Sequence, residues 1–104
     1  MVVRLPGITA PSGASEAALN AVDTEIIGEM ASSLGNAGRK VESCMRKLRL
    51  HVGDDESRGP LVKAAADAVY AYFVQRELCG LRRHDDAIRE YGIPREVLVR
   101  LGAR

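Results

Sequence analysis

The chain has 104 residues, of which 46% are hydrophobic and 28% charged, a composition typical of one globular domain. Fifteen Lys and Arg residues against 14 acids give a net charge of +1, so nothing indicates a phosphate backbone or an acidic membrane surface as partner. The longest apolar run, residues 69–74, is far shorter than the roughly 20 residues of a membrane span, and residues 1–11 lack the basic start and apolar core of a signal peptide. We therefore expect a cytoplasmic protein.

The start of the chain is rich in residues that interrupt helices. Two prolines and two glycines lie between positions 4 and 13, which excludes a regular helix there. The sequence therefore predicts an extended N-terminal arm over residues 1–14, followed by a single helical domain over residues 15–104. Cys44 and Cys79 fall at apolar helical positions, which favours two reduced thiols over a disulfide.

A long helix is predicted over residues 15–52. Apolar residues repeat along it at alternating spacings of three and four, typical of one apolar stripe on a helix; they are Ile27, Met30, Leu34, Ala37, Val41, Cys44 and Leu48. Gly35 and Gly38 each cost about 1 kcal/mol in a helix interior, so a stop at Gly35 with a new start after it is the alternative. The apolar phase continues across both glycines, however. Gly28, Ala31, Gly35 and Gly38 also form a stripe of small residues, which permits close approach of another helix and favours one continuous helix.

The rest of the chain predicts three further helices and no strand, giving an all-α fold. The second helix covers residues 60–79, with Pro60 at its first position, and it is apolar on nearly every side, so we expect it to be the buried centre. Two short helices follow over residues 85–91 and 94–101, each ended by a glycine.

The length of the first helix indicates a dimeric helical bundle. At 1.5 Å per residue it would measure about 57 Å, whereas a compact domain of this size is about 35 Å across and the second helix about 30 Å long. A second copy of the chain would cover the excess. Residues 5–38 contain four acids and no Lys or Arg, while residues 39–52 contain five bases and one acid. This gradient suits the dipole of any single helix, but it also favours an antiparallel homodimer, in which acidic and basic halves meet. The predicted interface consists of Ile27, Gly28, Met30, Ala31, Leu34, Gly35, Gly38 and Val41.

No stretch forms a catalytic, cofactor or metal signature, and we expect no cofactor. His84 and Asp85 offer one alternative, a small metal- or anion-dependent enzyme, because a histidine and an adjacent carboxylate can both bind a divalent cation. Such a site needs further ligands, and Asp85 is better explained as a cap or first-turn acid of the short helix that starts there.

Residues 85–101 offer a second alternative, a helix-turn-helix DNA-binding regulator. Two helices joined at Gly92 have that layout, and Arg95 and Arg100 would be the DNA-binding side chains. From residue 53 onward nine bases balance nine acids, so no basic face is evident and nucleic acid is an unlikely partner.

Two stretches, 73–85 and 91–98, together with the sequence SLGNAGR at 33–39, resemble a family of small, uncharacterised, all-helical bacterial proteins. The resemblance implies a helical fold and brings no activity, ligand or functional residue. The function predicted from the sequence is therefore that of a homo-oligomeric interaction or scaffold protein without catalytic activity.

Overall fold

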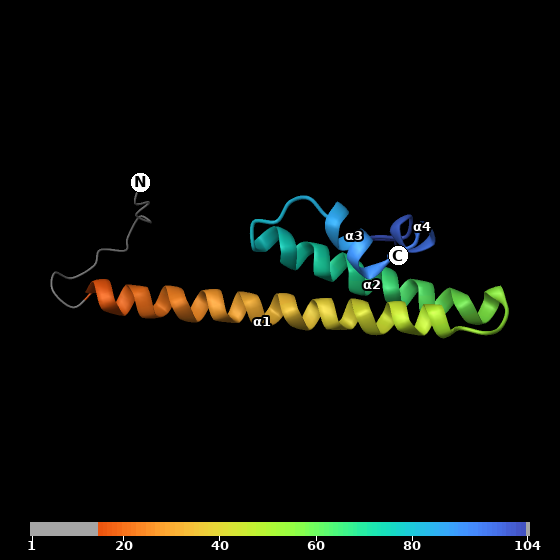
Figure 1. Cartoon of the computed structure of the whole chain (residues 1–104), viewed down its shortest axis with the longest axis horizontal. Coiled ribbons are helices and arrows are strands. Elements are labelled where there is room, and N and C mark those ends of the chain that lie inside the picture. The colour runs from red at the N-terminus through yellow and green to blue at the C-terminus, as the bar shows by residue number, and fades with distance from the viewer. Residues whose placement is uncertain (1–14, 104) are drawn as a thin grey trace.

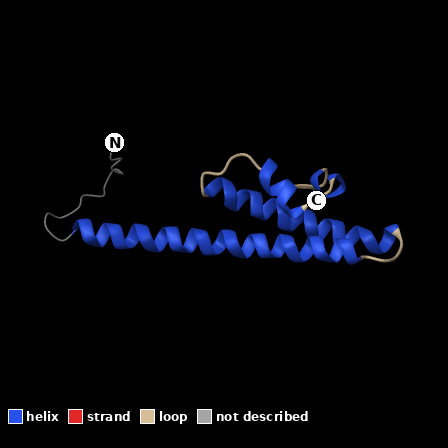
Figure 2. Cartoon of the chain, viewed as in Figure 1, coloured by secondary structure: helices blue, strands red, loops and turns tan. Residues whose placement is uncertain are grey.

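The computed structural model describes residues 15–103, and their side chains from residue 22 onward. Four helices follow one another in this part of the chain, and no strand is present in it. They are α1 (Ser15–Leu50), α2 (Asp55–Leu78), α3 (Asp85–Tyr91) and α4 (Arg95–Leu98). Figures 1 and 2 show a long helical hairpin of α1 and α2 with the two short helices beside it; α4 packs against α2, and α3 packs against α1. The all-α prediction is confirmed, whereas the predicted arm over residues 1–14 lies outside the described residues.

Helix α1 is continuous across Gly35 and Gly38, so the alternative of a break there is wrong. Its apolar stripe explains this continuity: Val41, Cys44 and Leu48 are buried, and this packing offsets the helix-forming cost of the glycines. The helix ends at Leu50, two residues before the predicted end at Val52. Val52 is 95% exposed and therefore has no packing that would extend the helix to it.

Helix α2 begins at Asp55, five residues before the predicted start at Pro60. The cause is a cap: the Asp54 carboxylate accepts a 2.9 Å hydrogen bond from the backbone N–H of Ser57, which also lowers the pKa of Asp54. Pro60 consequently lies in the second turn, where it lacks an N–H to donate to the carbonyl of Glu56. Glu56 is exposed, so water can satisfy that carbonyl.

The hydrophobic core lies between α1, α2 and the C-terminal segment. Val41, Val69 and Val97 are fully buried and come from α1, α2 and α4 respectively. Helix α3 ends at Gly92, which adopts the left-handed conformation at φ 61° and ψ 43°, as the predicted glycine stop requires. Helix α4 covers only residues 95–98 instead of the predicted 94–101, because hydrogen-bonded turns replace the helix after Leu98.

The molecule is much longer than a compact chain of this size. Its Cα radius of gyration is 19.1 Å and it measures 66 × 24 × 19 Å, whereas about 13 Å is expected for the radius of a compact 104-residue domain. The N-terminal part of α1 extends well beyond the end of α2 (Figure 1). None of the helices in the described part of the chain has the length and apolarity needed to span a bilayer.

Candidate functional site

The candidate site is the part of α1 that projects beyond α2. All side chains of residues 22–29, called here the exposed end of α1, are exposed, and Met30 is the first that is partly buried. The exposed end contains three large aliphatic residues, Val22, Ile26 and Ile27, and Ile27 is 66% exposed. Ile27 continues the stripe that becomes core at Val41. The same stripe is therefore buried against α2 at one end of α1 and open at the other.

The exposed end is also acidic. Asp23, Glu25 and Glu29 lie on it, no Lys or Arg occurs between residues 22 and 38, and none of these three carboxylates forms an ion pair within the described residues. The following half of α1 is basic, beginning with Arg39 and Lys40. The exposed end thus combines aliphatic side chains with carboxylates that have no counter-charge nearby in their own helix.

The structure divides the predicted interface residues into two groups. Ile27, Gly28 and Ala31 are exposed, and Met30, Leu34 and Gly35 are partly buried, so these six lie at or beside the open part of the stripe. Gly38 and Val41 are buried inside the chain itself and are no longer available to a second copy. At Gly38, a Cβ atom would lie 2.8 Å from the Tyr91 hydroxyl and 3.5 Å from the Tyr72 ring. One of the four small residues of the stripe, Gly38, therefore serves packing within the chain.

A second apolar surface lies on α2 and was not predicted from the sequence. Ala71, Val74 and Leu78, spaced by three and four residues, are all exposed, as is Leu81 just after the helix. The expectation that α2 is buried on every side is wrong in this respect, because α1 and the short helices cover only part of its circumference. The sequence does contain a sign of this surface. A helix that is apolar on all sides, in a chain with few other helices to cover it, must leave one apolar side exposed.

Arg76 organises the junction between α2 and α3. The residue is 7% exposed, and its guanidinium donates hydrogen bonds to the Arg83 carbonyl at 2.9 Å, Asp86 Oδ1 at 3.0 Å and His84 Nδ1 at 3.1 Å. Because Nδ1 accepts from Arg76, the hydrogen of the neutral imidazole is on Nε2, which donates to Glu77 Oε2 at 3.0 Å. The His84 ring also stacks on Phe73, with centroids 4.1 Å apart. These contacts hold the loop between α2 and α3 in place.

His84 and Asp85, the candidate metal ligands of the enzyme alternative, differ in their contacts with this cluster. Both nitrogens of His84 form hydrogen bonds, and Arg76 binds Asp86 and not Asp85, although both aspartates are exposed. The described side chains, those of residues 22–103, contain no group of three or more His, Cys, Asp or Glu that could hold a metal ion. Cys44 and Cys79 are both free thiols, as expected.

Tyr91 attaches α3 to the hairpin. Its ring meets that of Tyr72 edge to face, with centroids 5.5 Å apart, and its hydroxyl lies over Gly38. Burial and the hydrogen bond with Tyr72 raise the pKa of Tyr91 to about 12, because both disfavour the phenolate. The absence of a side chain at Gly38 therefore provides the space for this ring.

The second short helix holds Arg95, and Arg100 follows it; these are the two arginines predicted as DNA-binding side chains in the helix-turn-helix alternative. Helix α4 is a single turn, and its Glu96 pairs with Arg58 of α2 through two contacts, which lowers the pKa of Glu96. Arg95 and Arg100 are exposed and form no ion pair with any described residue. Since Ile93 and Val97 are buried against the core, α4 acts as a cover over the middle of α2.

The comparisons with known proteins identify a family and nothing beyond it. A family model described as "Family of unknown function (DUF6665)" matches residues 9–104, so the chain belongs to this family. No curated protein and no solved structure matches the chain. The resemblance to a family of uncharacterised helical proteins is thereby confirmed.

Proposed function

For this member of a family of unknown function, we propose a role as a homodimeric interaction or scaffold protein of the bacterial cytoplasm that associates through the exposed end of α1. The observation that carries the proposal is the exposure of Val22, Ile26 and Ile27 on a helix whose continuation is core. Contiguous apolar surface rimmed by polar groups is typical of protein interaction sites.

A second copy of the chain is the partner that fits these properties. In a two-fold symmetric dimer each contact occurs twice, so one pairing covers the exposed stripe of both copies. An antiparallel arrangement also places the acidic exposed end of one α1 beside the basic half of the other, whereas a parallel one places like charges together. The elongated shape, with a radius of gyration of 19.1 Å, supports the same proposal, because pairing would enclose surface that the single chain leaves open.

The small residues of α1 indicate where the two helices cross. Gly38 is occupied by Tyr91 and Tyr72, but a Cβ at Gly28 would meet nothing and one at Gly35 would meet only the flexible Arg39 guanidinium. Close approach is therefore possible between Gly28 and Gly35. A crossing centred on Ala31 places Asp23 of one copy level with Arg39 of the other, because the two residues are equally distant from position 31 in the sequence.

The first test is a single charged substitution in the exposed stripe. We expect wild type to be a dimer at micromolar concentration and Ile27→Lys to raise the dimer Kd by at least about a hundredfold, because the change occurs on both copies and buries an ammonium group. Sedimentation velocity measures both values.

Val52→Lys is the matched control, since Val52 is an exposed aliphatic residue two positions beyond the opposite end of α1. The control should retain the wild-type Kd. The proposal is wrong if Ile27→Lys and Val52→Lys have equal effects, or if wild type is a monomer.

A further inference from the structure

We infer that the dimer has a second contact surface: the exposed end of α1 of each copy lies against the C-terminal end of α2 of the other, where its carboxylates meet Arg82 and Arg83. This inference rests on the proposed homodimer and adds α2 and the loop after it to the interface.

The exposed end of α1 is too small to form a stable interface by contacting only α1 of the second copy. Stable interfaces take about 20–30 residues from each partner. One side of residues 22–29 supplies only a few of these, and the outer side of the following half of α1 is charged, with Arg39, Lys40 and Arg46 exposed. The apolar residues of the exposed end therefore need another apolar surface of the second copy.

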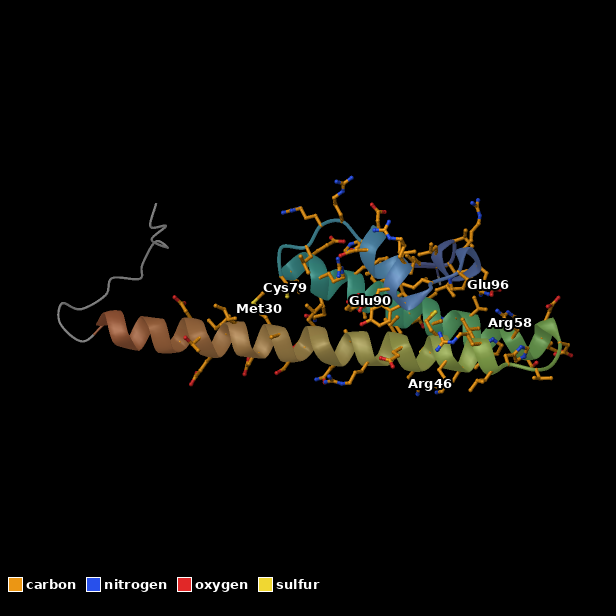
Figure 3. All side chains as sticks on the ribbon, in the orientation of Figure 1. Met30, Arg46, Arg58, Cys79, Glu90 and Glu96 are labelled. Carbon is orange, nitrogen blue, oxygen red and sulfur yellow. The ribbon has the colours of Figure 1, made fainter. Side chains whose placement is uncertain are left out.

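The exposed apolar stripe of α2, formed by Ala71, Val74 and Leu78, lies at the level along the molecule that the exposed end of the second copy's α1 would reach. With a crossing at Ala31, residues 22–29 of one copy are level with residues 33–40 of the other. Gly38 contacts Tyr72, and Met30 and Cys79 lie close together along the long axis (Figure 3), so this level corresponds to the last two turns of α2. Val74 and Leu78 are exposed in those turns, and Leu78 is 64% exposed.

Charge complementarity supports the same placement. An open hollow at the end of α2 is lined by four arginines and two aspartates, namely Arg76, Arg82, Arg83, Arg89, Asp85 and Asp86. Asp86 is already paired with Arg76, and the side chains of Arg82 and Arg83 have no ion-pair partner among the described side chains of residues 22–103. The exposed end supplies Glu25 and Glu29, which form no ion pair with a described side chain. Each surface carries the charge that the other lacks.

Reciprocal charge reversal in the full-length chain tests this contact. Glu29→Arg alone and Arg82→Glu with Arg83→Glu should each raise the dimer Kd about fivefold or more, because each reversal places like charges together at two symmetric positions. Combining the three substitutions should return the Kd to within about twofold of wild type. Circular dichroism at each step verifies that the variants are folded.

The control combines Glu29→Arg with Arg100→Glu, which reverses an exposed arginine at the far end of the C-terminal segment. It should not restore the dimer. If the triple variant recovers no better than this control, or if neither reversal changes the Kd of a dimer that Ile27→Lys still disrupts, this inference is wrong and the homodimer stands. A monomeric wild type would overturn both.

Discussion

At the scale of single residues, the glycines of α1 have different roles although the sequence presents them as one stripe. Gly38 is a packing position, because a side chain there would collide with the Tyr91 hydroxyl at 2.8 Å. Gly28 and Gly35 have no such contact. Spacing in the sequence revealed the stripe, but which glycine contacts which element depends on Tyr91, 53 positions further along the chain.

Alanine substitution separates these roles. Gly38→Ala should lower the free energy of unfolding by about 1 kcal/mol, because displacing the Tyr91 ring costs about 1–3 kcal/mol and the gain in helix propensity returns at most about 1 kcal/mol. Gly35→Ala should instead leave stability unchanged or raise it by up to about 1 kcal/mol, since only the flexible Arg39 side chain is near.

Urea denaturation in an Ile27→Lys background measures both effects without a contribution from the dimer. A Gly38→Ala variant as stable as Gly35→Ala would show that Tyr91 does not need this space.

At the scale of elements, Arg76 attaches the segment from residue 83 onward to α2. The buried guanidinium donates hydrogen bonds to the backbone of Arg83 and to the side chains of His84 and Asp86. Three residues at the start of this segment are therefore held by one side chain. Arg76→Met keeps most of the apolar volume and removes every donor. We expect it to lower the free energy of unfolding by about 1–3 kcal/mol, because three partly buried hydrogen bonds are lost together.

Arg89→Met is the matched control for Arg76→Met. Arg89 is an exposed arginine of α3, and its side chain forms no ion pair with a described residue. Its removal should change stability by less than about 0.5 kcal/mol. Urea denaturation and protection of the α3 amides from hydrogen exchange measure both variants. Equal effects would mean that the hydrogen bonds of Arg76 contribute nothing to the docking of α3.

The elements also show where sequence patterns suffice and where they fail. Apolar periodicity and the glycine at position 92 predicted α1 to within two residues and α3 at its observed bounds. The start of α2 was missed because Asp54, and not the residue before Pro60, caps the helix, so that Pro60 lies in its second turn. The end of α4 was missed because the turns after Leu98 replace its last helical turns. Both errors concern local hydrogen bonding, which apolar spacing does not report.

At the scale of the whole molecule, comparing element lengths predicted the most informative feature of the structure. A first helix much longer than its partner must project beyond it, and α1 does so with Ile26 and Ile27 exposed. The open stripe of α2 and the cluster around Arg76 were not predicted, since both depend on which sides of α2 the C-terminal segment covers. Long-range packing of this kind has no signature at fixed spacing in the sequence.

The most direct test of the account is the molar mass of the wild-type chain in solution. Sedimentation equilibrium over a concentration series should give twice the chain mass of 11.2 kDa at micromolar concentration and fall toward 11.2 kDa only on dilution. The dimer should also weaken as salt is raised, because its carboxylate and arginine contacts are exposed to solvent at their edges. A mass of 11.2 kDa at all micromolar concentrations would contradict the account.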